Sequence, residues 1–466
     1  MIWTIARKEA TEMLRDQRFQ WATGITLVLL MASLFVGWTH YTEVEAQRAL
    51  AQTTDREVWL DQGEKNQHSA AHFGTYAFKP NSPLTAMDRG VLAYTGVAVF
   101  MEGHRMADAE FRPAEDATAV QRLGSLTAAS TLQVLVPLLL ILLAFGTFAG
   151  ERERGTLRQL LSLGVHPRTL AAGKALGVTG PLLLLMVPAA TLGVWALLLG
   201  DGAGPLTAAR FALLVGVYGL YFALILGLTL VVSARARSAQ GALVGLLAFW
   251  LLTTFVVPRL VTDAADAVHP TPDPITFQAD IRADLNGLIP WAERTKAVQE
   301  RLMAEEGVSS VGDLTASVAG HTLLEAERDE TEVFRSHYAD LSAQHDGQRR
   351  VTQAGSVLTP YLAVKQLSMG LAGSDYTHHR HFAEAAEVYR YDFVQALNQD
   401  MIDAQSQFGH TVGREMWEQI PAFTYAAPGA GWAVAQYGLS LGVLGAWVLA
   451  LGLALPFTLR RMEVGR

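Results

Sequence analysis

Long apolar blocks alternate with polar stretches along this chain, and six of the blocks are almost unbroken runs of hydrophobic residues. A helix needs about 20 mostly apolar residues to cross the hydrocarbon core of a bilayer. The six predicted spans are residues 19–38, 126–149, three helices within 176–258 (about 176–199, 208–232 and 242–257), and 432–459. Buried helices of soluble proteins rarely run this long without a polar face. We therefore expect an all-α polytopic membrane protein with six transmembrane helices.

The polar stretches divide the rest of the chain. Residues 1–18 predict a helix lying on the membrane surface, because apolar and charged side chains fall on different faces. Residues 39–125 and 259–431 are long enough to fold outside the membrane, and the second stretch has helix-like apolar spacing. A short segment at 150–175 and a tail at 460–466 complete the chain. The sequence thus predicts an N-terminal interfacial helix and two extracytoplasmic, mainly helical regions.

Basic residues are concentrated in the short polar segments. With the N-terminus in the cytoplasm, residues 1–18, 150–174, 234–239 and 459–466 are internal, and together they carry a positive net charge. The long external regions are net negative. Lys and Arg favour the cytoplasmic side of short loops, so this arrangement predicts a multi-pass protein of the cytoplasmic (inner) membrane with both termini in the cytoplasm.

Composition excludes several classes of function. Only 17% of the residues are charged, against about 25% in an average soluble domain. There is no cysteine, which excludes disulfides, thiol nucleophiles and iron–sulfur ligation. A net charge of −8 argues against a nucleic-acid partner. No G-x-x-x-x-G-K-[ST] sequence occurs, so we expect no ATP-binding loop in this chain.

The segment GERERGTLRQLLSLGVHPRTLAAGK, residues 150–174, predicts a short amphipathic helix tethered between two spans. Thr156 is expected to cap its start, three leucines give it an apolar face, and Gly164 with Pro167 ends it. A helix held in this way can dock on a cytosolic partner and carry its movement to the spans. The candidate coupling residues are Glu151, Arg154, Gly155, Thr156, Leu157, Leu160, Leu161 and Gly164.

This segment resembles the coupling segment of ABC-2 type transporter permeases, in which a glutamate and a Gly-Thr pair precede a leucine-rich turn and a Gly-Lys. The matching residues are Glu151, Gly155, Thr156, Leu157, Leu160, Leu161, Gly173 and Lys174. Residues 72–84 and 367–390 are similar to recurring stretches of a subgroup with two enlarged external regions. The resemblance implies a pair of permease chains, identical or paralogous, with separate ATPase subunits that bind ATP and Mg²⁺. It implies no catalytic residue and no cofactor in this chain.

Histidines in the external regions suggest a second chemistry, because imidazole is a common metal ligand. His378, His379 and His381 cluster in one stretch, and His68 and His72 form a pair one helical turn apart. The alternative is that these residues are ordinary polar side chains of an external helix or loop. A protease of the H-E-x-x-H class is not expected, because that motif is absent.

Three hypotheses follow. The first is the permease subunit of an ATP-binding cassette transporter that exports a lipophilic or amphipathic substrate, and the near absence of ionisable residues within the spans favours energy supplied from outside the membrane. The second is a mechanotransmitter that drives a periplasmic envelope partner without transport. The third is a membrane-bound metal-dependent enzyme or metal-handling protein centred on the histidine cluster 378–381.

Overall fold

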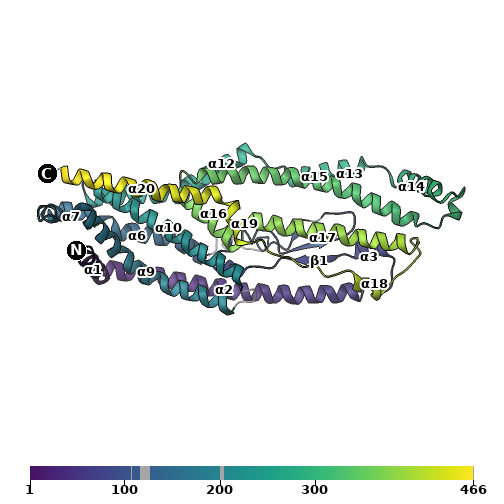
Figure 1. Ribbon diagram of the computed structural model, residues 1–466, viewed down its shortest axis with the longest axis horizontal. Coiled ribbons are helices and arrows are strands. Elements are labelled where there is room, and N and C mark those ends of the chain that lie inside the picture. The colour runs from purple at the N-terminus through teal and green to yellow at the C-terminus, as the bar shows by residue number, and fades with distance from the viewer. Residues whose placement is uncertain (107, 116–125, 200–203, 465–466) are drawn as a thin grey trace.

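The protein is an elongated, mainly helical molecule (Figure 1), and the computed structural model describes residues 1–106, 108–115, 126–199 and 204–464. About 76% of the chain is helical, with almost no sheet. α1 (Ile2–Arg15) and the end of α20 (Gly438–Val464) lie at the same end of the molecule, which we call the terminal end. The opposite half, which we call the distal half, contains α3, α13–α15, α17, α18 and a small sheet.

Five helices of the described chain are long and apolar enough to cross a membrane. They are Gln17–Leu60 (α2), Ala128–Glu153 (α5–α7), Pro205–Arg235 (α10), Ala239–Val268 (α11–α12) and Gly438–Leu459 in α20. The remaining predicted span falls in α9 (Pro167–Leu199), where several side chains lie outside the described residues. The expected all-α polytopic membrane fold is thus confirmed.

Two of these helices contain a π-helical turn next to a proline. Within the second span, Ala128–Ser130 (α5) is followed by the turn Thr131–Leu135, then by Val136–Ala144 (α6) and Gly146–Glu153 (α7). In the fifth span, Ala239–Leu251 (α11) and Val257–Val268 (α12) flank the turn Leu252–Val256. The wider turn accommodates a proline that has no N–H to donate. The Thr253 carbonyl accepts a hydrogen bond of 2.6 Å from the Thr359 hydroxyl, so it is satisfied within the protein.

One helix from the long region between the last two spans packs into the membrane bundle. α16 (Pro360–Ala372) contributes Ala363, Val364 and Leu367 to the same buried hydrophobic cluster as α6, α9, α10 and α20. Its Ser368 hydroxyl lies 2.9 Å from the Tyr218 hydroxyl of α10. The region 259–431 is therefore fixed to the spans by a helix that is apolar on most of its surface.

The distal half is built from long helices packed beside a three-stranded antiparallel sheet. Its helices are α3 (Gln67–Phe73), α13 (Pro274–Asn286), α14 (Trp291–Glu306), α15 (Val318–Gly355), α17 (Tyr376–Asp403) and α18 (Arg414–Gln419), and α19 (Ala430–Gln436) leads back to α20. The strands are β1 (Thr75–Phe78), β2 (Ala98–Met101) and β3 (Ala109–Glu110), in the order β1-β2-β3. Thr75 pairs with Met101, and Ala98 pairs with Glu110. Short 3₁₀ turns occur at Pro83–Ala86 (η1) and Val311–Asp313 (η4).

α2 joins the membrane bundle to the core of the distal half. It is one helix of 44 residues, about 66 Å long at 1.5 Å per residue. Near its far end Trp59 is 2% exposed, and its indole nitrogen donates a 3.0 Å hydrogen bond to the Trp417 carbonyl. The far end of this span is therefore anchored in the distal core.

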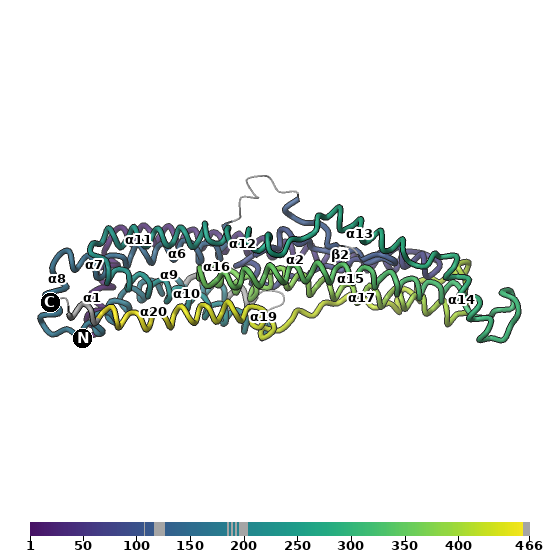
Figure 2. Tube along the Cα trace, turned by 90° about the horizontal axis from the view of Figure 1, so that it is seen from above, coloured from purple at the N-terminus to yellow at the C-terminus, as the bar shows by residue number. Residues whose placement is uncertain are grey.

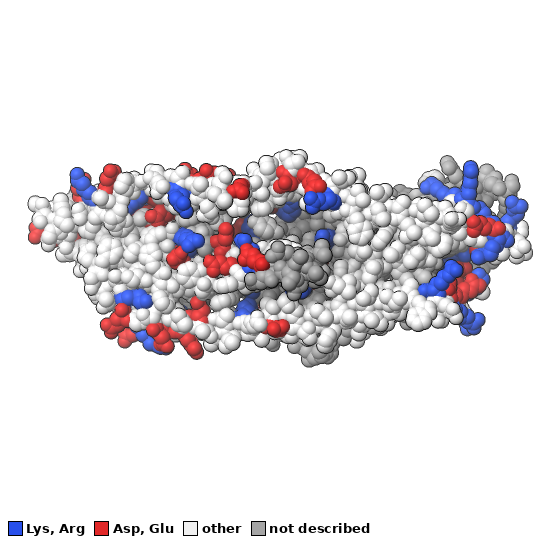
Figure 3. Space-filling model, turned by 180° about the vertical axis from the view of Figure 1, so that it is seen from behind, with Lys and Arg blue, Asp and Glu red and all other residues white. Residues whose placement is uncertain are grey.

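Charged side chains are also distributed according to the division into a terminal end and a distal half. Figure 3 shows them gathered at the terminal end and over the distal half, with an almost uncharged band between the two. Exposed apolar side chains such as Val28, Phe35 and Val244 lie on the spans. Such a band is what the hydrocarbon core of a bilayer requires, since charged groups there are costly.

Candidate functional site

A short helix, α8 (Thr156–Ser162), lies at the terminal end between two spans. Gly155 precedes it with a left-handed φ of 75°, and Gly164 follows it with a φ of 82°. After the last turn, the Gly164 and Val165 N–H groups donate to the Leu161 and Leu160 carbonyls at 3.2 Å, which is a glycine-based helix stop. Local backbone chemistry therefore fixes both ends of α8.

The expected cap by Thr156 is wrong. The capping position is occupied by Gly155, which has no side chain, and Thr156 is the first residue of the helix. Its hydroxyl donates instead to the Glu151 carbonyl at 3.2 Å and closes the sharp turn between α7 and α8. The physical reason is that the turn needs a positive φ at the residue before the helix, which glycine adopts without strain.

The leucine face of α8 points into the protein itself. Leu157 and Leu161 are 5% and 7% exposed and belong to the membrane-bundle core, and Leu160 packs against that core. The side of α8 that is open to solvent is therefore the opposite one. Its exposed residues, which we call the exposed face of α8, are Glu153, Arg154, Arg158, Gln159, Ser162 and Leu163.

The segment before α8 is fastened to the end of α10. Arg152 donates to the Ala236 and Ala234 carbonyls at 2.5 Å and 2.7 Å, where the last carbonyls of α10 have no partner within the helix. The Ser233 hydroxyl accepts hydrogen bonds from the backbone N–H groups of Phe148 and of the residue after it, at 3.0 Å and 3.1 Å. The segment before α8 is thereby fixed to the fourth span.

A buried lysine connects the same segment to α9 and α1. Lys174 is 1% exposed, and its ammonium lies 2.8 Å from Glu151 Oε1 and 2.9 Å from Glu9 Oε1. The Phe148 ring centroid lies 5.9 Å from the same nitrogen. Two carboxylates from different elements satisfy a cation that would otherwise be costly beside hydrocarbon. We call Glu9, Glu151 and Lys174 the terminal ion triad.

α1 lies against α9 along two glycines. A Cβ atom at Gly173 would lie 2.6 Å from Ile5 Cβ, and one at Gly177 would lie 2.5 Å from Glu9 Cβ and 2.9 Å from the Ala6 carbonyl oxygen. Side chains at these positions would therefore force the helices apart. Small residues four apart allow this close approach in membrane helices. The glycines thus bring Glu9 within reach of Lys174.

Sequence reasoning missed Glu9, Arg152 and Ser233 as parts of this site. A usable signal existed for the first, because a lysine at the start of a span needs a nearby carboxylate. Glu9 lies on the N-terminal helix, and Glu151 ends the preceding span. Nothing in the sequence alone points to Ser233, whose role depends on how two spans pack.

An apolar cavity of about 380 Å³ lies between α2, the start of the second span, α9 and α10, and η1 contributes to its lining. Its walls are almost entirely hydrophobic and aromatic, and they include Leu34, Trp38, Met87, Phe211 and Phe222. Cavities of this size and lining suit a lipophilic group, because burial of apolar surface stabilises the bound state.

The histidines at 378–381 have different partners. His378 Nε2 lies 3.0 Å from an Arg210 guanidinium nitrogen, and His381 Nδ1 lies 3.0 Å from the Tyr425 hydroxyl. His379 Nδ1 is buried without a hydrogen-bond partner among the described residues, and burial lowers the pKa of this imidazole to about 3. The three rings do not form a common ligand group in the described chain, and a guanidinium beside His378 disfavours a metal cation there.

The predicted pair of His68 and His72 has a third histidine, His104, as a neighbour. His68 and His72 lie beside His104, and His104 also lies close to Glu327 and Glu330. Burial, followed by the two neighbouring imidazoles, lowers the pKa of His68 to about 4. Although burial lowers the pKa of His104, its hydrogen bond to Glu330 raises the pKa above the usual value overall.

Comparison with known proteins identifies the family. The model of the "ABC-2 family transporter protein" family matches residues 3–330, which is more than half of the chain. The chain belongs to the ABC-2 transporter family. A second model, "Domain of unknown function (DUF3526)", matches residues 274–426, which include α13–α18. No curated protein matches the chain significantly. The expected family is confirmed, and as an ABC-2 family member this multi-pass membrane protein is a permease component of an ABC transporter.

Proposed function

We propose that this ABC-2 permease exports a lipophilic or amphipathic molecule across the inner membrane, driven by a separate ATPase that binds ATP and Mg²⁺. The terminal end faces the cytoplasm in this proposal, so both termini and α8 are internal. The excess of basic residues in the short segments at that end supports the orientation. Two permease chains, identical or paralogous, form the pathway with two ATPase subunits.

The observation that carries this proposal is the connection between α8 and three other helices. Arg152 joins the segment before α8 to α10, and Lys174 joins it to α9 and α1. The leucine face packs on the bundle core, which leaves the exposed face of α8 for the ATPase. A partner that pushes this face moves several spans as one unit, because buried contacts are not readily compressed.

The apolar cavity supports the substrate class. Its walls offer hydrophobic and aromatic contacts from four spans, namely α2, the start of the second span, α9 and α10. A lipophilic molecule, or the apolar part of an amphipathic one, gains about 25 cal/mol for each Å² of apolar surface removed from water. Movement of α9 and α10 by α8 would change the shape of this cavity.

A second function, mechanotransmission to an envelope partner, is favoured by α2. This helix runs without interruption from the terminal end into the distal core, where Trp59 is buried. ATP hydrolysis could therefore move the distal half without passage of a substrate. Vesicles containing the complex would separate the two functions, since only export accumulates a lipophilic probe.

Co-purification tests the coupling. The permease carrying Arg158→Glu on the exposed face of α8 is compared with Arg237→Glu, an exposed charge reversal in the loop after α10. We expect the first change to reduce the amount of bound ATPase by about tenfold or more, as removal of an interface arginine often does, and the second to leave most of it. Equal retention of the ATPase by both variants would contradict docking on α8.

A further inference from the structure

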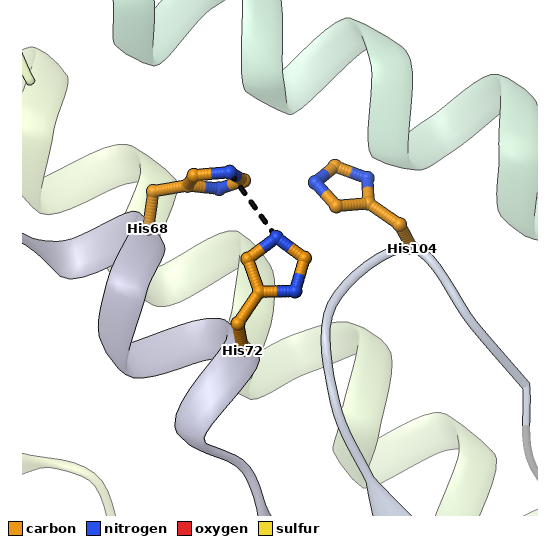
Figure 4. A group of neighbouring side chains, drawn as sticks. All are labelled: His68, His72 and His104. Carbon is orange, nitrogen blue, oxygen red and sulfur yellow. Dashed lines mark hydrogen bonds between the residues drawn. The ribbon is translucent and has the colours of Figure 1, made fainter.

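Three histidines from two segments of the distal half surround one small space (Figure 4). His68 and His72 lie one turn apart on α3, and His104 follows β2 in the chain. Each offers a ring nitrogen, and these three atoms lie within 4.8 Å of one another. The Nε2 atoms of His68 and His72 are 3.2 Å apart. Tetrahedral zinc with Zn–N bonds of about 2.0–2.1 Å places its nitrogens about 3.3–3.4 Å apart, so the observed spacing fits a shared ion.

The third imidazole is held in place by carboxylates. His104 has a left-handed φ of 64°, which is uncommon outside glycine. Its backbone N–H donates a hydrogen bond of 2.8 Å to Glu327 Oε2. Its Nδ1 lies 2.6 Å from Glu330 Oε2. Figure 4 shows the other ring nitrogen facing His68 and His72. A carboxylate bound to the far nitrogen is the usual way in which proteins orient a metal-binding histidine.

The supporting carboxylates are themselves fixed. Glu327 is fully buried, and its second oxygen accepts from Arg390 at 2.5 Å and from Thr331 at 3.2 Å. Arg390 also binds both oxygens of Glu387, at 2.7 Å and 2.9 Å. Arg390 therefore offsets much of the buried negative charge. Glu330 is not part of the network around Arg390 that is described above. Its negative charge therefore offsets the positive charge of a cation bound by the three histidines.

We propose that His68, His72 and His104 bind a zinc-type divalent cation through three imidazole nitrogens, with Glu330 orienting His104. Imidazole ligands favour this class of ion over Mg²⁺ and Ca²⁺, which prefer oxygen. His72 is exposed, so the ion reaches the site directly from solvent, and a water molecule completes the tetrahedral set.

The bound ion connects parts of the distal half that are far apart in the chain. α3 follows the end of α2, His104 lies beyond β2, and Glu330 belongs to α15. The cation therefore holds α3, which follows the end of α2, beside His104, which is bound to Glu330 of α15. This role is independent of ATPase coupling at α8, since α3 lies in the distal half (Figure 1) and α8 lies at the terminal end (Figure 2).

The test uses the full-length protein, purified in detergent through a tag without histidine and stripped of metal by a chelator. Zn²⁺ is titrated by calorimetry into wild type, His72→Ala and Glu330→Gln, with His410→Ala as a control because His410 is an exposed histidine of the same half. Co²⁺ is added in a parallel experiment to report the coordination geometry. Thermal unfolding of each metal-free variant establishes that it is folded.

We expect wild type and His410→Ala to bind Zn²⁺ in a one-to-one ratio. His72→Ala loses the site, and Glu330→Gln weakens binding by about 10–100-fold, as loss of an orienting carboxylate does elsewhere. The intense visible bands of four-coordinate Co²⁺ appear in wild type and are absent from His72→Ala. The proposal is overturned if folded wild type binds no Zn²⁺, if folded His72→Ala binds it equally well, or if Co²⁺ shows only weak octahedral bands.

Discussion

Replacement of Lys174 by Met tests the mechanical connection at the terminal end. The change keeps an unbranched apolar stem that ends at the same Cε position but removes the ammonium that binds Glu9 and Glu151. Glu151 is 6% exposed, and its Oε2 already has no hydrogen-bond partner within the described chain. Its carboxylate would be left buried without the cation that is hydrogen-bonded to it. The predicted effects are lower stability and weaker transfer of movement from α8.

The expected magnitude follows from burial. Removal of one partner of a buried ion pair costs about 3–5 kcal/mol, whereas exposed pairs contribute about 0–1 kcal/mol. Glu9 is partly exposed, with 17% of its side chain accessible, so water relieves part of its loss. Most of the destabilisation therefore comes from Glu151, and we expect about 3 kcal/mol for Lys174→Met. The double change Glu151→Gln with Lys174→Met should recover much of this, because no buried charge then remains unpaired.

The assay is reversible unfolding in mixed micelles, together with ATP hydrolysis by the assembled complex. Single and double variants form a thermodynamic cycle that isolates the coupling between Glu151 and Lys174. Arg237→Glu serves as an exposed charge control. A loss below about 1 kcal/mol for Lys174→Met would place this pair among exposed ion pairs and refute the reasoning.

Three further predictions concern packing and pH. Gly177→Ala should displace α1 from α9, since its Cβ would meet Glu9 Cβ at 2.5 Å, and faster proteolysis of the N-terminal helix measures this. Trp59→Ala should destabilise the distal half by about 3–5 kcal/mol, measured by hydrogen exchange. The lowered pKa of His379, about 3 when folded against 6.5 when unfolded, means that the unfolded chain binds more protons between these values. Stability should therefore fall as the pH drops from 6.5 towards 3, and His379→Gln should reduce this slope in pH-dependent unfolding.

Each of these predictions has a matched control. Gly180→Ala on the same helix meets no atom within 4 Å, so equal proteolysis of the two glycine variants would contradict the close-packing argument. Trp291 is 46% exposed, and its replacement by Ala should change hydrogen exchange far less than that of Trp59. His410→Ala removes an exposed imidazole. If this variant changes the pH dependence of stability as much as His379→Gln does, the prediction for His379 is contradicted.

Features set by local chemistry could be predicted from the sequence. The apolar blocks indicate the membrane helices because their length matches the bilayer. Gly155 and Gly164 mark the limits of α8, since each supplies a positive φ where the chain turns. The cap assigned to Thr156 was wrong because several residues around such a turn are compatible with a helix start, and backbone geometry decides among them.

Features that depend on distant parts of the chain could not be predicted. The leucines of α8 face the bundle rather than the partner, because the spans around them leave an apolar surface to cover. The carboxylates bound to Lys174 come from positions 165 and 23 residues away. His104 joins His68 and His72 only because β2 places it beside α3, whereas the adjacent histidines at 378–381 point to separate partners. Proximity in sequence was therefore a poor guide to a shared ligand site.

Site-specific crosslinking tests docking of the ATPase on α8 most directly. The chain has no cysteine, so Arg158→Cys places a single thiol on the exposed face of α8, and Ile275→Cys places one on α13, where the native side chain is 81% exposed. Each variant is assembled with the ATPase and treated with a short thiol-to-amine crosslinker. We predict a permease–ATPase product from Arg158→Cys and none from Ile275→Cys. A product from Ile275→Cys alone would contradict both the orientation and the coupling through α8.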